Sequence, residues 1–101
     1  MRRAGKIDAN QPLIVKALRD AGATVRIVSD VGHGFVDIVV GHRGLNFLME
    51  IKDPARKPSE RRLTEDERAF HLGWNGQVCV VETVEDALNW LEHGKAIMSQ
   101  W

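Results

Sequence analysis

Residues 35–52 constrain the fold more than any other segment, because two apolar runs are separated there by a short turn. The runs at 35–40 and 46–51 predict two strands, and the sequence Gly-His-Arg-Gly at 41–44 predicts a hairpin between them. With a loop at 42–45, Asp37 lies directly opposite Glu50, which puts their Cβ atoms about 5 Å apart on one face. A slip of one residue would move Asp37 to the other face. The register of this hairpin therefore decides whether the two acids meet.

The chain before the hairpin predicts a helix and a strand. Residues 10–21 carry apolar side chains at helical spacing, among them Leu13, Ile14 and Leu18. Asn10 is placed to cap this helix and Gly22 to end it. Residues 24–29 predict a strand, so one helix precedes three consecutive strands.

The chain after the hairpin predicts a helix, a strand and a further helix. Residues 54–58 begin and end with proline, which predicts irregular backbone. Thr-Glu-Asp-Glu at 64–67 has the pattern of a capping box, so a helix is expected to start at Thr64. Phe70 and Trp74 are expected on its inner face as core residues, and the alternative is a base-stacking platform. A strand at 77–81 and a helix that opens at residue 83 and ends at Gly94 complete the order.

This order of elements predicts an α/β domain with a mixed four-stranded sheet flanked by helices. Consecutive strands joined by short turns are antiparallel, whereas the fourth strand follows a helix and implies a parallel crossover. A chain of 101 residues has room for one compact domain. We therefore expect residues 1–101 to form a single domain, with a basic arm at 1–9 and an apolar tail at 95–101 that packs on the body or on a partner.

Composition and charge narrow the classes of function. The chain has 14 basic and 14 acidic residues, but residues 52–62 hold five basic and two acidic ones. Such a stretch is either a phosphate-binding arm or a solvated loop. One cysteine, Cys79, excludes an internal disulfide and a multi-cysteine zinc site, and its apolar neighbours predict burial. No segment approaches the ~20 apolar residues of a membrane span, and no secretory signal is present, which predicts a cytoplasmic protein.

Asp37, Glu50 and Lys52 are polar residues set into apolar strands. Side chains alternate along a strand, so Glu50 and Lys52 share a face. Two carboxylates beside a lysine suit Mg²⁺ or Mn²⁺, since these cations prefer oxygen ligands and keep waters that a substrate phosphate can replace. The alternative is a cross-strand ion pair on an exposed face of the sheet.

Asp37 followed by Glu50-Ile51-Lys52 on the next strand resembles the PD-(D/E)XK nuclease signature. Over residues 8–93 the chain resembles a stand-alone VRR-NUC-type domain, similar to small phage and prophage Holliday-junction resolvases. The resemblance implies a restriction-endonuclease-like αβββαβα core. It also implies that Asp37, Glu50 and the Ile51 carbonyl hold the metal and that Lys52 is the catalytic lysine. Glu67 stands where relatives often have glutamine, and is either an accessory site residue or only part of the capping box.

The family resemblance also bears on DNA binding and on two departures from the pattern. Leu13 stands where relatives often carry a glutamate on the first helix, and Val36 stands in place of the signature proline. His33 either touches the substrate phosphate or is a plain turn residue. Contacts with the DNA backbone are expected from the basic stretch, through Arg56, Lys57, Arg61 and Arg62.

Taken together, the residues and the resemblance predict a metal-dependent endonuclease that hydrolyses phosphodiester bonds in branched DNA. The expected substrate is the four-way junction, whose near two-fold symmetry suits a homodimer that makes paired nicks. The resemblance places the protein in the cytoplasm of a bacterial host, encoded by a phage or prophage. Two alternatives stay open: a nuclease that acts on flaps, ends or duplex, and a DNA-binding module of this fold with weakened catalysis, which the changes at Leu13 and Val36 favour.

Overall fold

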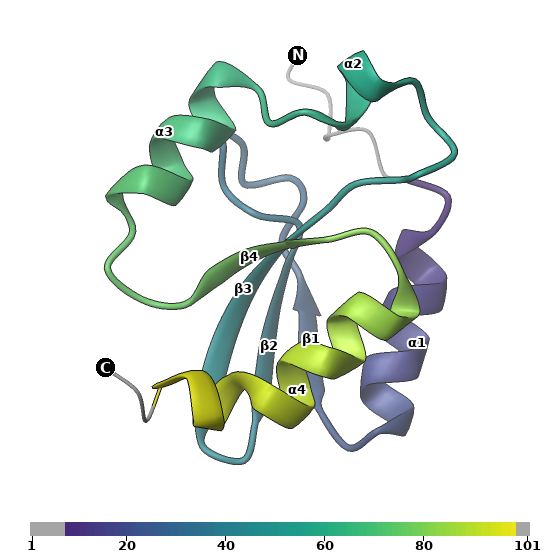
Figure 1. Ribbon diagram of the computed structural model, residues 1–101, viewed down its shortest axis with the longest axis vertical. Helices are drawn as coiled ribbons and strands as arrows, with labels where there is room; N and C mark the ends of the chain where they lie inside the picture. The colour runs from purple at the N-terminus through teal and green to yellow at the C-terminus, as the bar shows by residue number, and fades with distance from the viewer. Residues whose placement is uncertain (1–7, 99–101) are drawn as a thin grey trace.

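The computed structural model describes the backbone of residues 8–98 and the side chains of residues 8–94. Four helices and four strands follow one another along this part of the chain (Figure 1). In chain order they are α1 (Gln11–Asp20), β1 (Thr24–Ile27), β2 (Ile38–His42), β3 (Leu45–Ile51), α2 (Pro58–Arg61), α3 (Glu65–Gly73), β4 (Val78–Val81) and α4 (Val84–Met98). The expected order is therefore confirmed, with one addition. The short helix α2 forms in the basic stretch just after the proline-flanked segment.

The four strands form one mixed sheet with the order β1-β2-β3-β4. β1 and β2 are antiparallel, β2 and β3 are antiparallel, and β3 and β4 are parallel. The parallel pair results from the crossover through α2 and α3, as predicted. This topology brings the end of β3 and the end of β4 to the same edge of the molecule, and the candidate site lies there.

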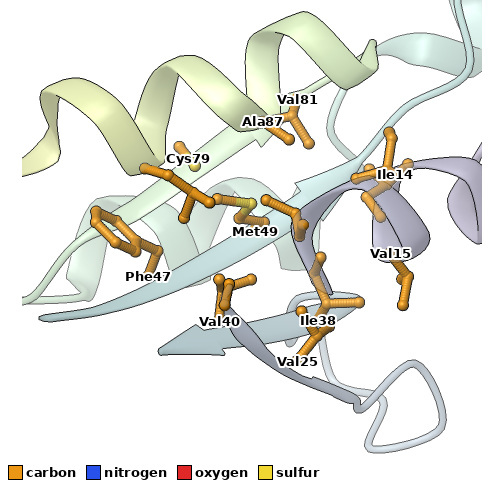
Figure 2. Close-up of a cluster of buried hydrophobic side chains, with 14 residues drawn as sticks. Ile14, Val15, Val25, Ile38, Val40, Phe47, Met49, Cys79, Val81 and Ala87 are labelled. Atoms are coloured by element: carbon orange, nitrogen blue, oxygen red, sulfur yellow. The ribbon is translucent and has the colours of Figure 1, made fainter. Parts of the chain in front are cut away.

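The hydrophobic core fills the space between one face of the sheet and the helices α1 and α4. Figure 1 shows these two helices together in the lower half of the view, with α2 and α3 in the upper half. Figure 2 shows the side chains that meet in this core, including Cys79, whose burial was predicted. The strand residues that contribute are Val25, Ile38, Val40, Phe47, Met49, Ile51, Cys79 and Val81. Since alternate side chains along β3 enter the core, Glu50 faces the opposite side of the sheet.

The hairpin between β2 and β3 has the predicted register but a shorter loop. Gly41 pairs with Asn46, and His42 pairs with Leu45, so the loop is the dipeptide Arg43-Gly44 rather than residues 42–45. Both loop residues have positive φ, 52° at Arg43 and 81° at Gly44, as a two-residue turn between twisted strands requires. The pair of His42 with Leu45 extends the hairpin by one position and leaves the register of the other pairs unchanged.

The first helix differs from expectation at its start and on its exposed side. Leu13 is 64% exposed, because the buried face is formed by Gln11, Ile14, Val15 and Leu18. The Asn10 side chain makes no capping hydrogen bond. Its amide instead donates to the carbonyl oxygens of Lys52, at 3.1 Å, and Glu82, at 2.9 Å. Asn10 therefore joins the start of α1 to the ends of β3 and β4.

The helix α3 begins as predicted, with Thr64 in a capping box, but it does not enter the core. It contributes no buried residue, and Trp74 at its C-terminal end is 43% exposed. The expected inner face is therefore only partly present, because Phe70 is half-buried against Phe35 while Trp74 is exposed, and neither residue enters the core. The core is already filled from the other side of the sheet by α1 and α4, so α3 contacts the body through its first turn and through Phe70.

The last helix continues beyond Gly94, which was expected to end it. Gly94 lies within α4, and a Cβ atom built there would overlap the ring of the buried Phe47. The missing side chain therefore lets α4 approach the sheet closely, and glycine here serves packing rather than termination.

Replacing Gly94 with alanine should destabilise the protein, although alanine normally favours a helix. The helix preference is worth about 1 kcal/mol, while forcing an extra methyl group into a packed core costs about 1–3 kcal/mol. Gly73→Ala is the matched control, since a Cβ there meets nothing within 4 Å. Urea unfolding should give a lower midpoint for Gly94→Ala than for the native chain. An unchanged or higher midpoint would contradict the packing argument.

Both ends of the chain leave expectations open. Of the basic arm expected at 1–9, residues 1–7 lie outside the described residues. Of the apolar tail expected at 95–101, residues 95–98 continue the backbone of α4, and residues 99–101 lie outside. Between residues 8 and 98, no helix is both long enough and apolar enough to cross a membrane.

Candidate active site

Asp37 and Glu50 meet at the end of the β2–β3 hairpin. Ile38 pairs with Met49, and Asp37, one residue earlier, donates its N–H to the Met49 carbonyl at 3.1 Å. The Ile51 N–H donates to Oδ2 of Asp37 at 2.7 Å, which fixes the carboxylate beside β3. The predicted register is confirmed, and it places the Asp37 and Glu50 side chains next to each other.

Lys52 completes the group from the same strand end. Its ammonium lies 3.5 Å from Oε2 of Glu50 and 2.9 Å from Oε1 of Glu67. Glu50 is 3% exposed and Lys52 8% exposed, so this is a buried cluster rather than an ion pair on an open sheet face. The alternative of a solvated cross-strand pair is therefore excluded.

Glu67 has both of the roles that the sequence left open. As the third residue of α3, it accepts a hydrogen bond from the Thr64 N–H at 2.9 Å and so closes the capping box. The same oxygen, Oε1, accepts from Lys52 Nζ at 2.9 Å. The capping interaction therefore positions a carboxylate over the lysine, and the start of α3 is part of the site.

A glycine-rich loop fastens α3 to the hairpin. Gly34 has a φ of +81°, and a Cβ atom there would overlap the Asp66 carbonyl group at the first turn of α3. The next residue, Phe35, packs edge-on against Phe70 with ring centroids 5.2 Å apart. Because this loop leads directly into Asp37, its close contact with α3 sets the distance between Glu67 and the hairpin.

These groups line a cavity of about 480 Å³ that opens to the surface. Its wall includes the hairpin acids, the glycine-rich loop, the basic stretch and the first turn of α3. The residues outside the hairpin that line it are Asp8, Ser29, Gly32, Gly34, Phe35, Arg56, Ser59, Glu60, Arg62, Thr64, Asp66 and Glu67. The cavity is therefore predominantly polar and carries both signs of charge.

Burial and crowding of like charges shift the proton affinities in this cavity. Burial raises the pKa of Asp37. Burial, and then the charges of Asp37 and Glu67, raise the pKa of Glu50 to about 9. Burial would lower the pKa of Lys52, but the hydrogen bond to Glu67 and the charge of Glu50 raise it overall. Three carboxylates thus share one ammonium, and the pocket is short of positive charge.

The donor set fits a hard divalent cation. Oε1 of Glu50 is a buried oxygen without a hydrogen-bond partner, and the carboxylate of Asp37 lies beside it. Among the described residues, no three His, Cys, Asp or Glu side chains are arranged to hold a metal. Two carboxylates and the backbone carbonyl of Ile51, with waters, correspond to the sparse protein ligation typical of Mg²⁺. The residues present therefore fit the expected cofactor, Mg²⁺ or Mn²⁺.

The four basic residues that follow Lys52 in the basic stretch differ in whether they line the cavity. Arg56 and Arg62 line the cavity, whereas Lys57 and Arg61 are not among the residues that do. Arg56 Nε lies 2.7 Å from Oδ1 of Asp8, which also lines the cavity. This ion pair could not be predicted from the sequence, because 48 positions separate Asp8 from Arg56 and no pattern links them. Backbone contacts by all four basic residues stay a prediction.

The remaining sequence candidates lie away from the chemistry. His33 is exposed with a φ of 59°, and only its neighbours Gly32 and Gly34 line the cavity. Leu13 is outside the cavity, so the first helix supplies no acid at that position. Val36 is fully buried, and its replacement of the signature proline is a core change.

Comparison with known proteins gives one structural match. No protein-family model matches the chain. No curated protein matches it either. A solved structure described as "VRR_NUC domain" is similar to it, with a TM-score of 0.54 and 27% sequence identity over 85% of this chain and 98% of that chain. The wider PD-(D/E)XK assignment and the resemblance to phage resolvases stay predictions. The protein has a fold similar to that of a VRR_NUC domain, as the resemblance over residues 8–93 predicted.

Proposed function

We propose that this protein is a divalent-metal-dependent endonuclease that hydrolyses phosphodiester bonds in DNA. The observation that carries the proposal is the convergence of Asp37, Glu50 and Lys52 on one carboxylate-rich cavity that opens to the surface. The similarity to a VRR_NUC domain supports it from the fold. The same arrangement is hard to explain as a stabilising feature, because three carboxylates share one ammonium and Oε1 of Glu50 is buried without a hydrogen-bond partner.

In this proposal Asp37, Glu50 and the Ile51 carbonyl hold Mg²⁺ or Mn²⁺. When bound, the ion offsets the negative charge of the phosphodiester and activates water for attack. Lys52 donates hydrogen bonds to a phosphate oxygen and stabilises the charge that develops there. Glu67 holds the ammonium of Lys52 in position, and the Ile51 N–H holds the carboxylate of Asp37.

Arg56 and Arg62 line the same cavity, and in this proposal they contact phosphates next to the scissile bond. Such contacts give affinity for any DNA sequence and weaken as salt is added. We further propose branched DNA, above all the four-way junction, as the substrate, and a homodimer as the active form, because two symmetry-related sites match the two strands to be nicked.

The test is cleavage of an end-labelled four-way junction while Mg²⁺ or Mn²⁺ is titrated into metal-free protein. We expect cleavage only with the ion, and a loss of about 10²–10³-fold in rate for Lys52→Ala, since one group that stabilises developing charge is removed. Lys16→Ala is the matched control, because that lysine side chain is 74% exposed on α1. Flap and duplex substrates, run beside the junction, measure the structural preference.

Several outcomes would contradict parts of this proposal. Cleavage that continues in excess chelator, or that is equal in Lys52→Ala, would exclude the mechanism. Junction binding without cleavage under any ion would favour the DNA-binding module with weakened catalysis. Sedimentation of the junction complex as one protein chain per DNA would exclude the homodimer.

A further inference from the structure

Three aromatic side chains form a continuous row from the cavity to the surface. Phe35 lines the cavity, and its ring meets Phe70 at a centroid distance of 5.2 Å and an interplanar angle of 79°. Phe70 in turn meets Trp74 at 5.2 Å and 30°. We call Phe35, Phe70 and Trp74 the aromatic row. It lies outside the hydrophobic core, which contains none of the three.

Two members of the aromatic row, Phe70 and Trp74, lie on one side of α3 and at its C-terminal end. Glu67, Phe70 and Trp74 are spaced at i, i+3 and i+7, which places them along one side of a helix. Glu67 contacts Lys52 at one end of this face, and the aromatic side chains continue from there. At about 1.5 Å per residue, Trp74 lies about 10 Å along the helix from Glu67. The two aromatic residues of this face, Phe70 and Trp74, are about 6 Å apart along the helix, which matches about two bases at about 3.4 Å per stacked base.

The indole of Trp74 is exposed but held in place. It is 43% exposed, and a Cβ atom at Gly76 would lie 2.8 Å from its Nε1, so the ring packs against the backbone of the turn before β4. Phe70 supports the ring from the helix side. A ring held on two sides and open to water on its remaining surface is preorganised for a flat ligand, because little side-chain entropy is lost on binding.

We propose that the aromatic row is a stacking platform for unpaired bases of the DNA strand whose backbone enters the cavity. The inference rests on the proposed nuclease function and deepens it. Aromatic side chains stack on bases of any sequence, but only where the base has left the duplex stack. The platform therefore selects DNA with unpaired or unstacked bases next to the scissile phosphate, as at a branch point, and fully paired duplex cannot use it.

The continuity of the row with the cavity favours this occupant over a protein partner. Phe35 lines the same cavity as Arg56 and Arg62, whose positive charges attract a phosphate backbone. A nucleotide held by its phosphate at the cavity would place neighbouring bases beside Phe70 and Trp74. Self-association through Trp74 is the competing explanation, and the experiment includes it as an outcome.

The test uses Trp74 as its own reporter. The chain has three tryptophans, and Trp90→Phe with Trp101→Phe leaves only Trp74. Fluorescence is recorded in Ca²⁺ without Mg²⁺ on a four-way junction with two unpaired thymines at the branch, on the same junction with abasic sites there, and on a fully paired duplex. We expect quenching by the first DNA and little change with the other two.

Affinity measurements on the full-length protein complete the test. Trp74→Ala should weaken binding of the junction with unpaired bases by about 5- to 100-fold, the range for one stacked base, and leave duplex binding within about twofold. Trp74→Phe should restore most of the loss because it keeps a ring. Leu72→Ala is the matched control, since Leu72 is 78% exposed on α3 but off the row.

Each other result overturns the inference in a distinguishable way. Equal quenching by the three DNAs, or unchanged affinity of Trp74→Ala, would remove the platform while leaving the nuclease proposal intact. A smaller sedimenting species for DNA-free Trp74→Ala would assign the row to self-association instead. A protein that binds no DNA of any kind would exclude the nuclease proposal together with the platform.

Discussion

Replacing Glu50 with glutamine is expected to abolish cleavage and to stabilise the metal-free protein at the same time. Glutamine keeps the shape of the side chain but loses the charge that would hold the cation, so we expect a loss of at least about 10³-fold in rate. The stability gain has a separate cause. Burial and the charges of Asp37 and Glu67 disfavour ionised Glu50, which is why its pKa is raised to about 9.

The stability effect depends on pH in a defined direction. A carboxyl whose pKa is about 9 in the folded state and has its ordinary value of 4.5 in the unfolded chain stabilises the fold fully below pH 4.5. That contribution is lost as pH rises from 4.5 through about 9. The glutamine of Glu50→Gln does not ionise, so this variant keeps its stability as pH rises. Its free energy of unfolding should therefore exceed that of the native chain by an amount that grows over the same pH interval. At neutral pH we expect about 1–2 kcal/mol, a rise in Tm of about 4 °C or more.

The measurement is thermal unfolding of both proteins in chelator between pH 5 and pH 9, followed by the same series with Mg²⁺. Mg²⁺ should raise the Tm of the native chain and leave that of Glu50→Gln unchanged, because a ligand stabilises only the form that binds it. Glu92→Gln makes the same chemical change at an exposed position of α4 and serves as the control. A lower Tm for Glu50→Gln throughout would show that Glu50 supports the fold.

The second large effect is expected at Gly34, where alanine should reduce both stability and activity. A Cβ atom there would overlap the Asp66 carbonyl, and the φ of +81° adds strain of about 1 kcal/mol. The loop and α3 must therefore move apart, which carries Glu67 away from Lys52. We expect a loss of about 2–3 kcal/mol in stability. A displacement of about 1 Å at the site should lower the rate about 10²-fold.

The matched control for this change is Gly44→Ala. Gly44 has the same φ of +81°, but a Cβ atom there meets nothing within 4 Å. Alanine at position 44 therefore introduces the backbone strain but no overlap with other atoms. We expect about 1 kcal/mol of destabilisation and near-native cleavage. Chemical denaturation and single-turnover cleavage measured on both variants separate the two contributions. Equal losses in the two variants would mean that the contact between the loop and α3 does not position the site.

The sequence was sufficient for the hairpin and for the acids that it brings together. Register follows from the period of two in β2 and β3 combined with a short turn, and both are local properties of the chain. The loop length was wrong, yet the register survived because adding the pair of His42 with Leu45 keeps every other pair unchanged. The capping box at Thr64 was likewise predictable, since its residues lie within one turn.

The other parts of the site depend on contacts between distant segments. The ion pair of Asp8 with Arg56 and the bonds from Asn10 to Lys52 and Glu82 join residues that no short pattern relates. The exposure of Trp74 was mispredicted for the same reason. Helical spacing shows that Phe70 and Trp74 share a face, but whether that face is covered depends on which side of the sheet the other helices occupy.

One oxygen of Glu67 accepts hydrogen bonds from two groups, the Thr64 N–H at the N-terminal end of α3 and the ammonium of Lys52. Fraying of the first turn of that helix and release of the lysine are consequently a single event. A helix that buries no side chain opens at lower free energy than the core does, so inactivation on warming should precede the loss of the sheet. The working temperature of the proposed nuclease is then limited by one helix terminus rather than by global melting.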